Sequence, residues 1–125
     1  MNKHHWFFDP FLFNAIRRSA GLDCVRITVC GSAPLSNEVK RFLRCILNGI
    51  VVEGYGATET CGPTTIEYAD DTSVGTVGGS IPCCFVKLVD VPEMGYYATD
   101  RVHEESLCLG RGELCIKGYN IFSDY

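Results

Sequence analysis

The sequence lacks a cluster of basic residues, and its net charge is −4 with a pI near 5.3. A surface that binds nucleic acid needs clustered Lys and Arg to neutralise phosphates, whereas the 11 cations here are scattered along the chain. The sequence also lacks a run of about 18 apolar residues, the length needed to span a bilayer. We therefore expect no nucleic-acid partner, and we expect any membrane association to be peripheral or to involve segments outside this sequence.

The N-terminal stretch also lacks the apolar core of a signal peptide, because its apolar patch is short and is cut by Asp9-Pro10, so we do not expect secretion. The 8 cysteines form no C-x-x-C pair, and the 3 histidines do not lie at ligand spacing from them. Neither a disulfide scaffold nor a zinc site is therefore expected. We predict an intracellular, cytoplasmic protein with free thiols, several of them buried as small core hydrophobes.

What is present is 125 residues with 46% hydrophobic content, the size and composition of one globular, soluble domain. The first part of the chain alternates helix-like and strand-like segments. Asp9-Pro10 and the apolar residues after it predict a helix that Gly21 closes. Residues 24–30 are β-branched and apolar, which predicts a strand that runs directly into a loop.

Ser36 is expected to cap a second helix, which ends at Asn48-Gly49. The spacing predicts a buried apolar face made by Val39, Phe42, Leu43, Ile46 and Leu47. The solvent face is expected to carry Glu38, Lys40, Arg41 and Arg44. Residues 50–52 follow as a second strand. The order strand, helix, strand predicts two adjacent parallel strands joined by a right-handed crossover.

Each predicted strand ends in a glycine-bearing loop, at residues 31–35 and 54–60. In open α/β sheets ligands bind outside the carboxyl ends of the strands, and parallel strands bring these ends to one edge. In the second loop two glycines allow close backbone approach, Thr58 offers a donor to phosphate oxygens, and Glu59 offers a hard oxygen ligand for Mg²⁺. Taken alone, each loop has a structural alternative: a tight turn whose glycines need positive φ, or a strand-to-helix connector.

After Thr72 the chain changes to short runs separated by glycine and proline, and no long helical period follows Leu47. Residues 85–91 and 114–117 predict strands, and residues 93–109 predict an exposed connection or hairpin with solvated charges. The predicted fold class is α/β. A partial parallel βαβ layer covers about residues 7–70, and a mostly β, barrel-like segment covers about residues 71–125.

Four motifs carry a family resemblance: Gly31-Ser32-Ala33-Pro34-Leu35, residues 54–60, residues 77–82 and residues 112–118. In order and spacing they resemble the adenylate-forming enzymes, and among them the long-chain acyl-CoA synthetases (long-chain fatty acid CoA ligases). Residues 87–96 are similar to the eukaryotic long-chain branch in particular. The resemblance extends over about residues 7–125.

The resemblance implies a reaction in two steps. A fatty carboxylate attacks the α-phosphorus of ATP and releases pyrophosphate, and the thiol of CoA then opens the acyl-adenylate. By position, Thr58 would hydrogen-bond the α-phosphate and Glu59 would hold Mg²⁺, while Tyr55 would lie against adenine between Gly54 and Gly56. The implied border of the adenine site and the acyl channel is Gly31, Ser32, Ala33 and Pro34. ATP, Mg²⁺ and CoA are the implied cofactors and cosubstrates, and a long-chain fatty acid is the implied substrate.

Several elements of that family have no counterpart here: the Ser/Thr/Gly-rich phosphate loop with its lysine, the ribose-binding Thr-Gly-Asp, and the small domain with its catalytic lysine. The resemblance therefore implies a fragment of the large N-terminal domain that is inactive by itself, because groups for positioning and charge stabilisation are missing. Two alternatives belong to other classes: a short non-catalytic nucleotide- or acyl-binding module, and an interaction fragment without a ligand.

Overall fold

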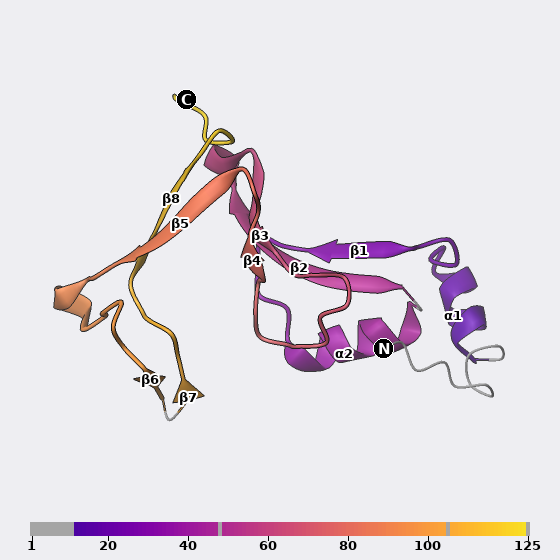
Figure 1. Cartoon of the computed structure of the whole chain (residues 1–125). Helices are drawn as coiled ribbons and strands as arrows, with labels where there is room; N and C mark the ends of the chain where they lie inside the picture. Colours follow the sequence, from indigo (N-terminus) through magenta and orange to yellow (C-terminus); the bar gives the residue numbers. More distant parts are fainter. Residues whose placement is uncertain (1–11, 48, 105, 125) are drawn as a thin grey trace.

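The computed structural model describes residues 12–47, 49–104 and 106–124. Its helical elements are α1 (Asn14–Ser19), α2 (Asn37–Ile46) and the 3-10 turns η2 (Thr58–Thr60) and η3 (Pro92–Met94). Its strands are β1 (Ile27–Cys30), β2 (Ile50–Ala57), β3 (Gly62–Ile66), β4 (Gly79–Ser80), β5 (Cys84–Val89), β6 (Val102–His103), β7 (Ser106–Leu107) and β8 (Glu113–Gly118). The main sheet has the order β1-β2-β3-β4, while β5 pairs with β8 and β6 with β7 (Figure 1).

α1 is terminated by Gly21, as the sequence predicts. Gly21 has a φ of +68°, and its N–H donates to the Arg18 carbonyl at 3.1 Å, a left-handed helix end that glycine adopts without a Cβ clash. The predicted cap at Asp9-Pro10 lies outside the described residues. Arg17 is buried and donates to the Ile46 carbonyl at 2.6 Å, so it joins α1 to the last turn of α2.

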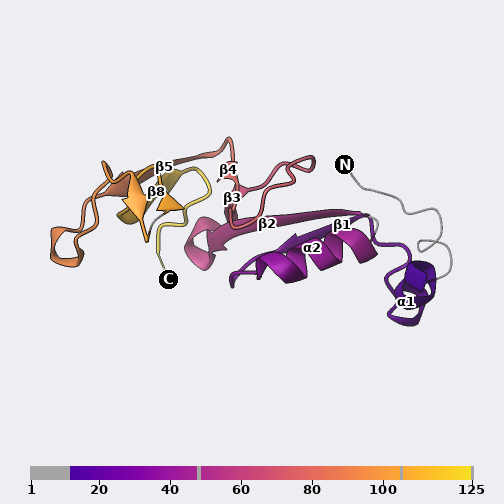
Figure 2. The ribbon, with the colours of Figure 1, turned by 90° about the horizontal axis from the view of Figure 1, so that it is seen from below.

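β1 and β2 pair in parallel, from Ile27 opposite Ile50 to Cys30 opposite Glu53, with α2 between them in the chain. α2 lies along one face of this pair (Figure 2). The predicted parallel βαβ arrangement is confirmed. β1 begins later than expected, because residues 22–25 form a turn in which the Val25 N–H donates to the Leu22 carbonyl at 3.3 Å.

The predicted cap of α2 is confirmed, because Ser36 Oγ accepts a hydrogen bond from the Val39 N–H at 3.3 Å. The predicted division of its faces is partly wrong. Ile46 and Leu47 are buried against Val51, with Phe13 and Leu43 packed on them. However, Val39 and Phe42 are 45% and 58% exposed, whereas Lys40 is fully buried. Lys40 is turned inward because two buried carboxylates, on Glu53 and Glu67, lie within reach of its ammonium group.

The segment predicted as one loop, residues 54–60, is mostly strand. β2 continues through Ala57 because β3 pairs with it antiparallel, with a register shift between Tyr55 and Gly56. η2 and the following residue, Cys61, connect these two strands. The predicted site residues on β2 are therefore held by a hydrogen-bonded ladder, which positions them more firmly than an open loop would.

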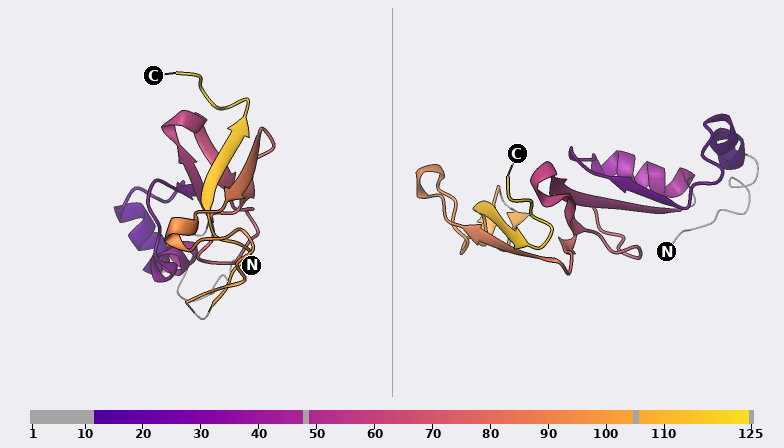
Figure 3. Two further views of the ribbon diagram at one scale, coloured as in Figure 1. Left: turned by 90° about the vertical axis from the view of Figure 1, so that its left-hand side faces the viewer. Right: turned by 90° about the horizontal axis from the view of Figure 1, so that it is seen from above.

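The second half is mostly β. β5 and β8 form an antiparallel ribbon from Cys84 opposite Gly118 to Val89 opposite Glu113, which confirms both predicted strands. The predicted exposed connection contains η3 and the short β6–β7 hairpin. Figure 3 shows the β5–β8 pair and α1 at opposite ends of the main sheet.

The core is small for the length of the chain. Among the residues that the structure describes, the buried apolar ones are Ile46, Leu47, Val51, Val52 and Cys84. The accessible surface is 9448 Å², against about 6,600 Å² for a compact protein of 13.8 kDa. The excess leaves large apolar side chains in water, including Leu107 and Leu109 at 90% and 91% exposure.

All eight cysteines are free, as expected, but Cys84 is the buried one, and five of the others are exposed. The expectation of several core cysteines is therefore wrong, because the core has room for few side chains. Among the described residues, no helix is both long and apolar enough to cross a bilayer.

Candidate ligand site

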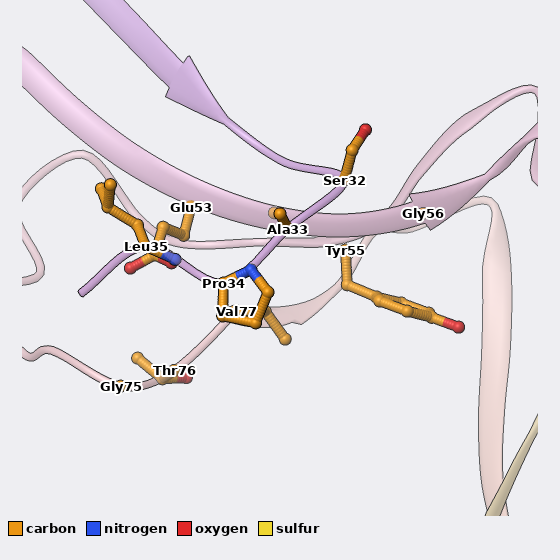
Figure 4. Close-up of a pocket in the computed structure, with 11 residues that line it drawn as sticks. Ser32, Ala33, Pro34, Leu35, Glu53, Tyr55, Gly56, Gly75, Thr76 and Val77 are labelled. Atoms are coloured by element: carbon orange, nitrogen blue, oxygen red, sulfur yellow. The ribbon is translucent and has the colours of Figure 1, made fainter. Parts of the chain in front are cut away.

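The two glycine-bearing segments meet at a cavity of about 580 Å³ that lies beyond the point where the parallel pairing of β1 and β2 ends, at Cys30 and Glu53. Residues 32–35 form one side, residues 53–56 of β2 form the floor, and residues 75–77 form the remaining side. Figure 4 shows Glu53 at one end of the cavity and Tyr55 at the other. The prediction that the two segments lie at one edge is confirmed, and the size is that of a small-molecule pocket.

A second cavity, of about 600 Å³, shares Ser32 and residues 54–56 with the first. It is lined further by Gly31 and Thr58, and by the start of β3 at Gly62 and Pro63. Of the predicted site residues, all except Glu59 therefore line one or both cavities. The two cavities therefore adjoin each other at Ser32 and residues 54–56 of β2.

The structure shows why residues 54 and 56 are glycines, which the sequence does not reveal. A Cβ added at Gly56 would lie 2.1 Å from the Gly62 carbonyl oxygen, and one at Gly54 would lie 2.8 Å from that of Thr65. Neither has a positive φ, which rules out the turn alternative for this pair. The glycines let β2 and β3 approach each other closely.

The loop after β1 contains a strained residue. Ser32 has a φ of +70°, a left-handed conformation that costs a non-glycine residue roughly 1–2 kcal/mol. Gly31 precedes it in close contact with β2, since a Cβ there would lie 3.3 Å from the Gly54 carbonyl. The tight bend brings Ser32, Ala33 and Pro34 over the cavity instead of letting the chain continue along the sheet (Figure 4).

η2 presents Thr58 and Glu59, both exposed, at the end of the β2–β3 hairpin. Thr60, which sequence reasoning missed, secures the turn: its buried Oγ1 accepts from the Ala57 N–H at 2.9 Å and contacts the Gly62 carbonyl at 2.6 Å. The signal for it was weak, because a hydroxyl in a turn is common. The turn is therefore rigid although its two predicted catalytic side chains face solvent.

The chain after β8 supports this turn from the other side. Asn120 Nδ2 donates to the Thr60 carbonyl at 2.9 Å, and the Phe122 N–H donates to the Glu59 carbonyl at 3.2 Å. Nothing in the sequence pattern indicates these contacts, because they join segments 60 residues apart. The mostly β second half is thus coupled to the turn that carries Thr58 and Glu59.

A buried charge network lies beneath the first cavity. Lys40 Nζ is 2.5 Å from Glu67 Oε1 and 2.8 Å from Glu53 Oε1. Glu67 Oε2 accepts from the Glu53 N–H at 2.8 Å, and Glu53 Oε2 accepts from the Leu35 N–H at 3.3 Å. One feature of the sequence indicates this network. Glu53 ends the apolar run Val51-Val52, and a carboxylate buried with such a run needs a charged or hydrogen-bonding partner. In the described part of the chain, no group of three or more His, Cys, Asp or Glu side chains is placed to hold a metal ion.

The third side of the cavity is shaped by hydrogen bonds to backbone. Arg44 donates to the carbonyls of Asp71, Thr72 and Ser73, each at 2.9 Å. The Asp71 carboxylate accepts from the Ser73 N–H at 2.8 Å, and this bond lowers the pKa of Asp71 below its ordinary value. These contacts set the path of the chain into residues 75–77.

An α/β sheet with cavities next to the end of its parallel pairing is an arrangement that small-molecule-binding proteins commonly have. The family model described as AMP-binding enzyme matches residues 2–125. Human long-chain-fatty-acid–CoA ligase 6 is 42% identical over 118 residues, which are 94% of this chain and 16% of that protein. Fatty acyl-CoA synthetase A of Dictyostelium discoideum is also 42% identical over 118 residues, 94% of this chain and 17% of that protein.

Among solved structures, the A domain of the carboxylic acid reductase from Segniliparus rugosus was determined in complex with AMP and a co-purified carboxylic acid. It is 37% identical with a TM-score of 0.53, over 74% of this chain and 12% of that chain. The chain belongs to the AMP-binding enzyme family. It spans about one sixth of the length of the curated relatives it matches.

Proposed function

We propose that this chain acts within a longer ATP-dependent long-chain fatty acid–CoA ligase, as part of its adenylate-forming site. The reaction would join a fatty acid to CoA through an acyl-adenylate, with release of pyrophosphate and AMP. The observation that carries the proposal is the pair of cavities on residues 54–56, which gives room for a nucleotide and an acyl group on one strand. The names of the relatives support the substrate class.

Within this proposal Tyr55 lies against the adenine ring and Thr58 binds the α-phosphate. Tyr55 is 40% exposed and lines both cavities, so one face of its ring is available for stacking. Gly31, Ser32, Ala33 and Pro34 border the adenine and the adjoining acyl group. Thr58 lies on the rigid turn next to the second cavity, where its hydroxyl can reach a phosphate oxygen.

Glu59 would hold Mg²⁺ together with phosphate oxygens of ATP. A single exposed carboxylate fits this ion, which binds in enzymes through one or two carboxylates, waters and substrate phosphates. When bound, Mg²⁺ neutralises charge that develops on the phosphate oxygens. The described residues therefore need no group of several acidic ligands for this role.

The test is fatty-acid-dependent exchange of pyrophosphate into ATP by the full-length protein, with Glu59→Ala as the variant. We expect the exchange rate to fall by about 100-fold or more, because metal stabilisation of the transition state is worth several kcal/mol. Glu93→Ala is the matched control, since Glu93 is also an exposed acid in the first turn of a 3-10 helix. Undiminished exchange in Glu59→Ala would remove the metal role. Saturable binding of ATP without any exchange in the wild type would favour a non-catalytic nucleotide-binding module.

A further inference from the structure

Lys40 is the centre of a buried network of four charges. Its side chain has 0% exposure, and the carboxylates it contacts belong to side chains of 8% and 0% exposure, on Glu53 and Glu67. Arg44 adds a second positive charge, 3.9 Å from Glu67 Oε2. The two positive and two negative charges balance, so removal of Lys40 alone leaves an uncompensated negative charge in the interior.

Glu53 connects this network to the wall of the first cavity. One of its oxygens faces Lys40, and the other accepts the Leu35 N–H. Pro34 has no N–H to donate. The Leu35 N–H is therefore the backbone donor through which Glu53 holds this loop, next to the helix cap at Ser36. Oε1 of Glu53 has no hydrogen bond within the described residues, so its ion pair with Lys40 is the contact that fixes this end of the carboxylate.

The opposite wall depends on the same network. Glu67 bonds both Lys40 and the backbone N–H of Glu53, and it lies near Arg44. Arg44 in turn holds the three carbonyls that precede residues 75–77. Both walls are therefore connected to Lys40, one through Glu53 and the other through Glu67 and Arg44. Lys40 itself does not line either cavity.

We propose that Lys40 is a positioning residue for the ligand cavity: through Glu53 it fixes Leu35 and the loop of residues 32–35, and with it the shape of the nucleotide site. The choice of MgATP as the probe rests on the proposed function; the position of the loop does not. Lys40 never contacts the ligand, so its effect is on the fraction of molecules in which the cavity is correctly formed. If that fraction falls to about one tenth, the apparent dissociation constant rises about tenfold.

The test uses the full-length protein and three variants. Lys40→Met removes the ammonium group and keeps most of the side-chain volume. Lys40→Met/Glu53→Gln and Lys40→Met/Glu67→Gln each restore the balance of buried charge, and they differ only in which carboxylate becomes an amide. In the first double variant the new amide can still accept the Leu35 N–H through its carbonyl oxygen, whereas the second leaves Glu53 charged and without Lys40.

Two measurements are made on each protein: the MgATP dissociation constant by calorimetry, and hydrogen exchange of the backbone amides of Ser32, Ala33, Leu35 and Ser36. We expect Lys40→Met to bind MgATP about tenfold more weakly and to exchange faster in this segment. Lys40→Met/Glu53→Gln should recover thermal stability, MgATP binding and slow exchange together. Lys40→Met/Glu67→Gln should recover less of the thermal stability, because Glu53 stays charged without Lys40, and it should recover neither MgATP binding nor slow exchange. With a purely structural role, binding and exchange would follow thermal stability in proportion in every variant.

The outcomes separate the two proposals. A wild-type protein that does not bind MgATP contradicts the proposed function, while hydrogen exchange in residues 32–36 still decides the role of Lys40. Exchange that is unchanged in Lys40→Met, or equal in the two double variants, overturns the positioning role even if the wild type binds MgATP. If Lys40→Met does not fold, the comparison of the two double variants gives the decision.

Discussion

Gly56→Ala adds one methyl group at the closest approach of β2 and β3. The new Cβ would lie 2.1 Å from the Gly62 carbonyl oxygen and 2.9 Å from Pro63 Cα. The backbone must open by about 1 Å to reach 3.0 Å, below which Cβ atoms are essentially never found. Gly56 does not have a positive φ, so the cost comes from this clash and not from backbone conformation.

Overpacking of this kind costs about 1–3 kcal/mol, and each kcal/mol lowers the midpoint of thermal unfolding by about 2–8 °C in domains of ordinary size. The opening also moves residues 54–56, which line both cavities, so MgATP binding should weaken together with stability. Differential scanning fluorimetry and calorimetry of the full-length protein measure the two effects.

Gly79→Ala is the matched control for this variant. Gly79 is also a strand glycine without a positive φ, but a Cβ there meets nothing within 4 Å. We expect it to leave both the unfolding midpoint and the MgATP affinity unchanged. Equal unfolding temperatures for Gly56→Ala and Gly79→Ala would contradict the conclusion that residue 56 must be glycine because β2 and β3 approach closely there.

Two further predictions concern the surroundings of the site. Asn120→Ala removes the hydrogen bond to the Thr60 carbonyl and should lower the free energy of unfolding, measured with urea, by about 1 kcal/mol. It should also weaken MgATP binding, and unchanged binding would contradict the conclusion that residues after β8 support the turn. Asp71 is expected to respond to acid. The bond from the Ser73 N–H lowers its pKa below the ordinary 3.8, so its stabilisation of the turn is complete above the unfolded pKa and is lost as pH falls through the folded value. The NMR shift of the Ser73 amide should therefore titrate below pH 3.8 in the wild type, and an equal titration in Asp71→Asn would refute this assignment.

The βαβ unit could be predicted because local signals agree there. The apolar run at residues 50–52 predicts its strand, and the hydroxyl of Ser36 marks the start of α2. Parallel pairing then requires the segments after the two strands to meet, which places Ser32 and Tyr55 at one cavity without any tertiary information. This part of the candidate site follows from topology.

The burial of Lys40 could not be predicted from helical periodicity. A lysine at that spacing is normally solvated, and its burial depends on Glu53 and Glu67, which lie 13 and 27 residues further along the chain. Nor did the glycines of residues 54–60 reveal that β2 continues through Ala57, because a strand end becomes a hairpin only when a partner such as β3 pairs with it. Long-range partners decided both features, and single-sequence patterns contain little information about them.

The hydrogen bonds from Asn120 and Phe122 to η2 also set an order of events during synthesis. Asn120 follows Thr60 by 60 residues. At a rate of synthesis of about 5–20 residues per second, Asn120 is therefore added to the chain roughly 3–12 s after Thr60. During that interval the hairpin of β2 and β3 can pair, but the Glu59 carbonyl does not yet have its hydrogen bond from the Phe122 N–H. The turn that carries Thr58 and Glu59 should therefore reach its full stability only after the residues beyond β8 have left the ribosome.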